Sequence, residues 1–302
     1  MSVFFEQLLN GFQLGMLLFL ISSGLTLIFG VMHFINLAHG SLYMAGAFAL
    51  AGMQLLFDNF LLAVLFGLIA VVALAVCLEM SLLRRLYHRD HLAHVLATFA
   101  LIIIADDGVK YLTGGQSVFV ELPAWLSGTV EILPGLPYPL YRLFVTLMAI
   151  VISIGLFLLI QHTRIGMLVR AGASDQEMVR SLGVNIKLLY SIIFALGAAL
   201  AAFAGMLVAP MFAIEVGMGE TILILVFVII CIGGVGSIRG TLVAALIVGM
   251  IDTMGRAYVI PGLSLLLPAR EAASMGPALV SISIYVFMAI VLVMRPRGLL
   301  TR

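Results

Sequence analysis

Long apolar stretches with few or no Asp, Glu, Lys or Arg residues alternate with short polar connections along the chain. A helix needs roughly 20 apolar residues to cross the hydrocarbon core of a bilayer. The pattern predicts two spans within 7–57 and further spans at 61–83, 92–112, 143–163, 188–214, 221–238, 241–251 and 277–294. We therefore expect an all-α fold, a polytopic transmembrane helical bundle of about 8–10 spans, with residues 1–302 forming a single transmembrane domain.

Two interruptions of the apolar pattern predict broken helices, near 32–40 and near 233–240. The first holds His33, Asn36, Ala38, His39 and Gly40, and the second holds Gly233, Gly234, Gly236, Ser237 and Gly240. Unwound backbone at membrane depth requires surrounding protein or a watery cavity. The first break is therefore either part of a translocation path or an ordinary capped turn. The second either lets two helices approach closely through its G-x-x-x-G spacing or forms a tight turn.

The composition is typical of a membrane protein and excludes soluble globular domains and nucleic-acid-binding proteins. Hydrophobic residues make up 64% of the 302 residues and charged residues only 10%, whereas soluble domains are about 25% charged. A net charge of +1 provides no basic field for nucleic acid, so no nucleic-acid partner is expected. The two cysteines, Cys77 and Cys231, lie in apolar runs and are interpreted as small buried hydrophobes.

Most of the basic residues collect in alternate connections, which orients the chain. These are Arg84, Arg85, Arg89, Arg164, Arg170, Arg180, Lys187, Arg239, Arg295, Arg297 and Arg302, whereas the other connections carry Asp58, Glu121, Glu131, Glu215 and Glu220. Cytoplasmic loops carry an excess of Lys and Arg, so the pattern predicts a periplasmic N-terminus and a cytoplasmic C-terminus. The longest outer connection, 113–141, is rich in proline and is expected to be a surface loop with a short interfacial helix.

The largest cytoplasmic connection, about 163–188, contains the signals of a short helix at 175–182. Ser174 and Glu177 have capping-box spacing, and Gly183 stands where a glycine would end the helix. Such a helix either docks on a partner protein, with Met178 and Leu182 exposed, or rests on the membrane surface.

Few side chains suggest chemistry. Asp106 and Asp107 interrupt the predicted 92–112 span. They are interpreted either as a proton site or as charges near the outer end of the span, with Lys110 as their partner one turn away. His33 and His39 lack a carboxylate or cysteine that would complete a metal site, and the chain has no phosphate-binding loop of the form G-x-x-x-x-G-K-[ST]. No metal site and no catalytic residues are predicted.

Three ordered blocks resemble a known family. The first break reads GVMHFINLAHGSLYMAGAF, the 163–207 segment reads TRIGMLVRAGASDQEMVRSLGVNIKLLYSIIFALGAALAAFAGML, and the C-terminal blocks read GGVGSIRGTLVAALIVGM and RPRGLL. They are similar to the branched-chain amino acid permeases of ATP-binding-cassette importers, and the first block is more similar to the LivH type than to the longer LivM type. The resemblance covers nearly the whole chain.

This resemblance implies a non-enzymatic transporter subunit of the bacterial inner membrane. It implies as partners a second permease subunit of the LivM type, two ATP-binding subunits and a periplasmic solute-binding protein. ATP would then be bound by the partners, and this chain would need no cofactor. A branched-chain amino acid is the implied substrate, and related permeases carry urea, short amides or aromatic acids. The alternative from the residues is a self-contained secondary transporter in which Asp106 or Asp107 binds a proton.

Family position also implies roles for residues. The ATPase-docking element would comprise Arg170, Ala171, Ser174, Asp175, Glu177, Leu182, Gly183 and Asn185. The residues beside the translocation path would be His33, Asn36, Ala38, His39 and Gly40.

Overall fold

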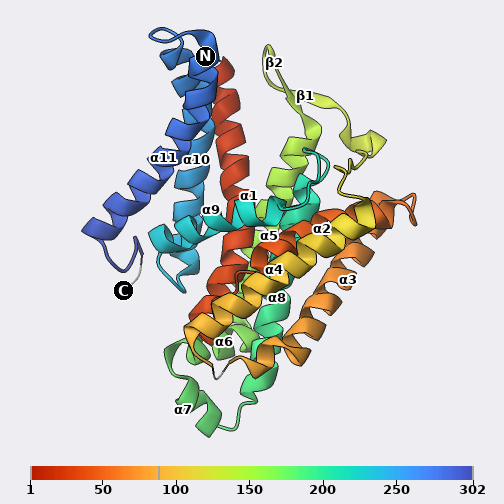
Figure 1. Ribbon diagram of the computed structural model, residues 1–302, viewed down its shortest axis with the longest axis vertical. Helices are drawn as coiled ribbons and strands as arrows, with labels where there is room; N and C mark the ends of the chain where they lie inside the picture. The colour runs from red at the N-terminus through yellow and green to blue at the C-terminus, as the bar shows by residue number, and fades with distance from the viewer. Residues whose placement is uncertain (1, 88, 301–302) are drawn as a thin grey trace. The chain divides into compact units, whose positions relative to one another are not determined.

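Helices account for nearly all regular structure in the computed structural model, which describes residues 2–87 and 89–300. The helices are α1 (Ser2–Met32), α2 (His39–Gln54), α3 (Phe60–Ser81), α4 (His91–Thr113), α5 (Leu140–His162), α6 (Arg164–Ser174), α7 (Gln176–Ser181), α8 (Ile186–Val208), α9 (Met218–Gly233), α10 (Ile238–Leu263) and α11 (Ala269–Met294), as Figure 1 shows. Two 3₁₀ turns, η1 (Leu83–Arg85) and η2 (Ala124–Leu126), and two strands, β1 (Thr129–Leu133) and β2 (Leu136–Pro139), complete the described elements.

Seven described helices are long and apolar enough to cross a membrane, namely α1, α3, α4, α5, α8, α10 and α11. The predicted polytopic helical membrane protein is therefore confirmed. The other two predicted segments correspond to α2 and α9, which have 16 residues each and are shorter than the roughly 20 residues that a span requires. Each of these short helices lies next to one of the predicted breaks.

The chain divides into two compact units. One comprises 2–19, 124–151 and 227–300, and is called unit 1; the other comprises 20–87, 89–123 and 152–226, and is called unit 2. The chain crosses between the units within α1, α5 and α9, whose residues divide between them, and between Pro123 and Ala124.

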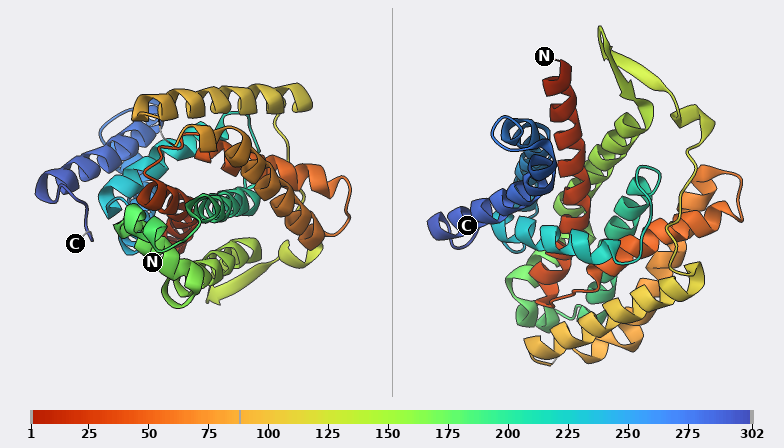
Figure 2. Two further views of the ribbon diagram at one scale, coloured as in Figure 1. Left: turned by 90° about the horizontal axis from the view of Figure 1, so that it is seen from below. Right: turned by 45° about the horizontal axis from the view of Figure 1, so that its top comes forward.

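In unit 2 the helix α8 is the core element, because its small residues allow neighbouring backbones to approach. It packs against α2 and α3, and α2 lies alongside α4 (Figures 1 and 2). A Cβ added at Gly46 of α2 would lie only 2.1 Å from the carbonyl oxygen of Ala202 in α8. Only 22% of the α3 span and 17% of the α4 span are buried, so apolar faces of both helices remain uncovered, as lipid contact requires.

In unit 1 the helix α10 packs against α11, and a Cβ on its Gly249 would lie 2.5 Å from the backbone nitrogen of Gly15 in α1. The outer connection differs from its prediction: η2 is a single three-residue 3₁₀ turn, and β1 and β2 form an antiparallel hairpin. Tyr138 of β2 is buried and its hydroxyl donates to Asn10 Oδ1 at 2.9 Å. This contact holds the hairpin on α1.

Both helix breaks lie where the sequence predicts them. The first helix ends at Met32 and α2 begins at His39, whereas α9 ends at Gly233 and α10 begins at Ile238. At the second break, Gly234 and Gly236 have φ angles of 97° and 79°, a region that glycine enters without steric cost. A Cβ on Gly240 would lie 1.9 Å from the oxygen of Gly233, so the turn depends on the absence of a side chain there.

Candidate functional site

The break between α1 and α2 buries polar side chains that the structure leaves partly unsatisfied. His39 and Asn36 are both fully buried. His39 Nε2 contacts the carbonyl oxygen of Ile21 at 3.1 Å, and since a carbonyl only accepts, Nε2 carries the proton and Nδ1 is an acceptor. Among the described residues, neither atom of the Asn36 side-chain amide has a hydrogen-bond partner, and neither does His39 Nδ1. Buried polar groups normally have a protein or water partner, so these atoms are available to a water molecule or a polar solute.

Close backbone contacts hold the start of α2 in place. A Cβ on Gly40 would lie 2.2 Å from the oxygen of Gly219 at the start of α9, and one on Gly219 would lie 2.4 Å from the oxygen of Gly40. A Cβ on Gly24 of α1 would lie 3.1 Å from the ring of His39. Ala38, the residue before α2, gives no side-chain cap. The buried polar residues of the break are therefore positioned by backbone packing.

The 163–188 connection contains two helices, α6 and α7, where the sequence predicted one. Thr163, Asp175 and Asn185 cap α6, α7 and α8 in turn, each with a side-chain oxygen that accepts a backbone N–H at 2.9–3.1 Å. The cap of α7 is therefore Asp175, and the capping role predicted for Ser174 is wrong, because Ser174 is the last residue of α6.

The predicted helix-ending glycine is confirmed. Gly183 has a φ angle of 82°. Its N–H donates to Arg180 O, and the N–H of Val184 donates to Val179 O. These two bonds form the Schellman arrangement that satisfies the last carbonyls of a helix. Gly183 therefore fixes where α7 ends and where the chain turns toward α8.

One face of the short helix α7 is open and apolar. Met178 and Leu182 are 63% and 73% exposed, whereas Val179 is buried. Of the other residues assigned to docking, Arg170, Ser174, Glu177 and Asn185 are exposed and Ala171 is half-buried. Arg170 Nη1 donates to the carbonyl oxygen of Ile160, which holds α6 against the end of α5. The assigned residues thus lie on one connection, and most of them are accessible.

Gln176, the first residue of α7, links the 163–188 connection to the first break by hydrogen bonds. The amide nitrogen of Gln176 donates to Val31 O, in the last turn of α1, and to His33 Nδ1 at 3.3 Å. Its amide oxygen accepts from the hydroxyl of Tyr190 in α8 at 2.7 Å. Sequence reasoning missed Gln176 and Tyr190, because contacts between residues 143 and 145 positions apart leave no local signal.

A second network that the sequence did not reveal surrounds Glu79, which is fully buried near the end of α3. Its carboxylate pairs with Arg84 at 3.3 Å and accepts from the hydroxyls of Tyr87 and Ser191, each at 2.7 Å. Burial, and then the bond to Glu79, raise the pKa of Tyr87 above its usual value, so its phenol stays protonated as the donor. The ring of Tyr87 meets that of Tyr190 edge to face, with centroids 5.3 Å apart.

The second break has a different environment, within unit 1. Ser237 caps α10, its hydroxyl oxygen accepting the N–H of Gly240 at 3.1 Å. The C-terminal segment packs on the break: the N–H of Leu299 donates to Ile232 O at 2.9 Å, and a Cβ on Gly298 would lie 2.4 Å from Gly234 Cα. Two blocks that the sequence singled out therefore form one folded element.

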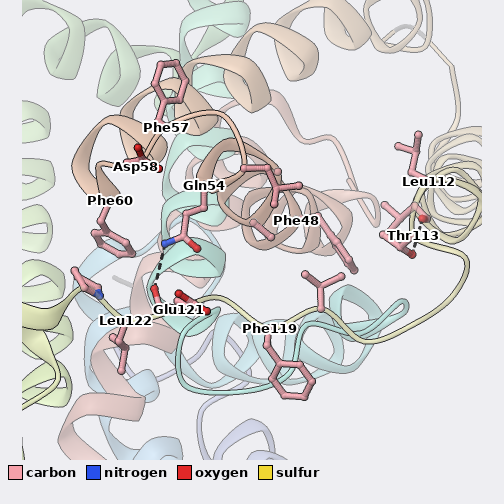
Figure 3. Close-up of a pocket in the computed structure, with 16 residues that line it drawn as sticks. Phe48, Gln54, Phe57, Asp58, Phe60, Leu112, Thr113, Phe119, Glu121 and Leu122 are labelled. Carbon is pink, nitrogen blue, oxygen red and sulfur yellow. Dashed lines mark hydrogen bonds between the residues drawn. The ribbon is translucent and has the colours of Figure 1, made fainter.

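Unit 2 also contains a pocket of about 760 Å³, at the end where α2 and α4 terminate and α3 begins. Its wall is mainly apolar, and Gln54 Nε2 donates to the backbone oxygen of Glu121 at 3.1 Å across it (Figure 3). Asp58 and Glu121 are exposed acidic residues that belong to its lining. The ring of Phe57 is stacked on that of Phe66, with ring centroids 4.9 Å apart.

The two acidic residues within α4 lie near its C-terminal end. Asp106 is half-buried and its carboxyl group lies beside that of Glu220 in α9, whereas Asp107 is exposed. In the described part of the chain no ion pair joins Asp106 to Lys110, so the partner expected from the one-turn spacing is not the one that the fold provides.

Comparison with known proteins identifies similar sequences over most of the chain. The profile of the family described as branched-chain amino acid transport system / permease component matches residues 7–294. The high-affinity branched-chain amino acid transport system permease protein LivH of Salmonella typhimurium is 28% identical over 271 residues, which cover 85% of this chain and 87% of that protein.

Two further relatives are also similar over most of the chain. The permease protein BraD of the same kind of system in Pseudomonas aeruginosa is 27% identical over 266 residues, covering 83% of this chain and 86% of the relative. A probable branched-chain amino acid transport permease protein LivH of Methanocaldococcus jannaschii is 28% identical over 256 residues, covering 80% of this chain and 78% of the relative. No solved structure matches the chain.

Proposed function

Because this chain belongs to the family of branched-chain amino acid transport system permease components, we propose that it is the membrane-spanning subunit of an ATP-binding-cassette importer. It would pair with a second permease subunit of the LivM type. Two separate ATP-binding subunits would bind ATP and supply the energy, and a periplasmic solute-binding protein would deliver the substrate. This chain then performs no ATP chemistry and needs no cofactor of its own.

The observation that carries the proposal is the exposed face of α7, on a connection whose helices are capped by side chains at their starts. Met178 and Leu182 are large apolar side chains that unit 2 leaves uncovered, while Asp175 and Gly183 fix both ends of the helix. A helix with defined ends and an open apolar face is suited to docking a partner protein. Movement of the ATP-binding subunits would act on the permease through α6 and α7.

The translocation path would pass the break between α1 and α2. Asn36 and His39 are polar, buried and incompletely hydrogen-bonded, which suits transient contact with a polar solute. Substrate would cross by alternation between inward-open and outward-open states. The carried solute would be a branched-chain amino acid, with urea, short amides or aromatic acids as the alternatives within the family.

The chain would lie in the bacterial inner membrane with its N-terminus in the periplasm and its C-terminus in the cytoplasm. The excess of basic residues in the connections after α3 and α5 and at the C-terminal end supports this orientation. It would place α6 and α7 in the cytoplasm, where ATP-binding subunits are found, and the pocket that includes Asp58 and Glu121 on the opposite side.

The test is capture of the tagged chain from its own membranes in mild detergent, with mass spectrometry of the proteins that accompany it. The wild-type chain should bring down ATP-binding subunits and a second permease. Leu182→Asp should release the ATP-binding subunits and retain the second permease. Leu56→Asp is the matched control, because Leu56 is also 73% exposed but lies in the turn that follows α2, and it should retain all partners.

The competing function gives a different result. A self-contained secondary transporter would be recovered alone, and uptake by the purified chain would be sensitive to an uncoupler and to Asp106→Asn. The neighbouring carboxyl groups of Asp106 and Glu220 are the feature that favours this alternative. Recovery of the chain alone together with such uptake would replace the importer assignment.

A further inference from the structure

Both polar atoms of the Gln176 side chain make hydrogen bonds within unit 2. Its amide nitrogen has two protons, one donated to Val31 O and one to His33 Nδ1. Because Val31 O can only accept, the nitrogen rather than the oxygen of the amide must face α1. The amide oxygen then accepts from the Tyr190 hydroxyl at 2.7 Å. One side chain of α7 therefore binds α1, the break and α8 together.

The partners on α1 are groups that the helix itself leaves open. The last carbonyls of a helix have no partner within it, and Val31 lies one residue before the end of α1 at Met32. His33 follows with a φ angle of 52°, the only non-glycine residue at positive φ in the described part of the chain. Such a conformation is uncommon for residues other than glycine, Asn, Asp and His, and persists when neighbouring contacts support it. The bond from Gln176 to the ring of His33 is such a contact.

The partner on α8 extends the connection away from α7. The ring of Tyr190 meets Tyr87 edge to face, and the hydroxyl of Tyr87 donates to the buried carboxylate of Glu79 at 2.7 Å. Phe34, the residue after His33, also meets Tyr87, with ring centroids 5.7 Å apart. The break, α7, α8 and the end of α3 thus share one continuous set of contacts.

We propose that Gln176 is the positioning residue through which α7 controls the conformation of the break between α1 and α2. This inference rests on the proposed function and deepens it. Displacement of α7 by the ATP-binding subunits withdraws the amide from Val31 O and His33, which removes support from the positive-φ residue at the break. The start of α2, with the buried Asn36 and His39, is then free to change its position.

The experiment measures coupling rather than activity alone. The complete importer, with ATP-binding subunits and solute-binding protein, is reconstituted in lipid vesicles, and uptake of radiolabelled leucine is measured together with ATP hydrolysis. Gln176→Ala should assemble normally and hydrolyse ATP, and its leucine uptake per ATP hydrolysed should fall about tenfold, within the 5–150-fold range of common coupling effects. Gln161→Ala is the matched control, since Gln161 is an exposed glutamine in the last turn of α5, and it should keep the wild-type ratio.

A second variant separates a positioning role from a general loss of stability. Tyr190→Phe removes only the hydroxyl that donates to Gln176 and keeps the ring that contacts Tyr87. It should also lower the ratio, and the double variant should be no worse than Gln176→Ala alone, because both changes break the same connection. If Gln176→Ala fails to assemble, Tyr190→Phe decides.

The outcomes distinguish this inference from the proposed function. Unchanged leucine uptake per ATP in Gln176→Ala, or in Tyr190→Phe where the first variant does not assemble, overturns the inference and leaves the importer assignment intact. Strictly additive losses in the double variant also overturn it. Absence of ATP-driven leucine uptake in the wild-type complex, in contrast, contradicts the proposed function as an importer of branched-chain amino acids.

Discussion

Addition of one methyl group at Gly46 should disrupt the packing of α2 on α8. The Cβ of Gly46→Ala would lie 2.1 Å from Ala202 O and 2.6 Å from Ala202 Cα. Non-bonded heavy atoms are comfortable at about 3.5–4.0 Å, so the two helices would have to separate by roughly 1 Å or more. Since the obstructing atoms belong to the backbone of α8, no rotation of a side chain relieves the contact.

Two opposing effects set the expected magnitude. Overpacking of a close contact costs about 1–3 kcal/mol, and the backbone position of the clash places this site at the upper end. Alanine is favoured over glycine in a helix by about 1 kcal/mol. We therefore expect Gly46→Ala to lower the free energy of unfolding by about 2 kcal/mol.

Gly52 provides a control on the same helix. No heavy atom lies within 4 Å of a Cβ added there, and the residue is exposed. Gly52→Ala should therefore raise the free energy of unfolding by up to about 1 kcal/mol, through helix propensity alone. Both variants are measured by reversible unfolding in mixed micelles of a mild detergent and SDS, with helical circular dichroism as the signal. If both substitutions change stability in the same direction and by the same amount, the backbone contact between α2 and α8 is refuted.

Three further predictions concern side-chain networks. Glu79→Ala should lower the free energy of unfolding by about 2–3 kcal/mol in the same assay, because the hydroxyls of Tyr87 and Ser191 lose their buried acceptor and the partly exposed Arg84 loses its ion pair. A loss below about 1 kcal/mol would refute the buried network. Burial raises the pKa of Tyr87, so the protonated phenol stabilises the fold below about pH 10. This contribution to the free energy of unfolding is lost as the pH rises above that value. The free energy of unfolding should therefore fall more steeply between about pH 9 and 11 in the wild type than in Tyr87→Phe. Asn10→Ala removes the acceptor shared by donors from β2 and α5, and amide hydrogen exchange of the hairpin should become faster, whereas exchange in α8 should not change.

The local parts of the fold could be predicted because their signals are local. A run of polar and small residues inside an apolar stretch marks the end of a helix, and both breaks fall within the predicted ranges. Gly183 ends α7 as its position predicts, since few residues other than glycine tolerate its φ angle. The hairpin was missed because proline is unusual in strands, yet β2 includes Pro137 and Pro139 and buries Leu136 and Tyr138 on one face.

The errors in the candidate site come from choices that sequence alone does not decide. Ser174 and Asp175 are both favourable capping residues, and the Ser–Glu spacing pointed to Ser174. The fold uses Asp175 because α6 continues through Ser174. The bonds of Gln176 to α1 and the burial of Glu79 depend on helices that meet only in three dimensions, so a periodic pattern does not reveal them.

The two breaks meet the same physical requirement in different ways, and this difference indicates which one can move. A helix that ends inside protein leaves carbonyl groups that need donors. At the second break the donor to Ile232 O is the N–H of Leu299, a backbone group of the adjoining C-terminal segment. Close glycine contacts and the Ser237 cap complete that turn within the same unit. At the first break the donor to Val31 O is the side chain of Gln176. This residue belongs to the exposed 163–188 connection, to which the proposed ATP-binding subunits would bind. A displacement of α7 therefore changes the hydrogen bonding of the first break and leaves the hydrogen bonding of the second break unchanged. An ATP-driven movement would reach the solute path through the first break.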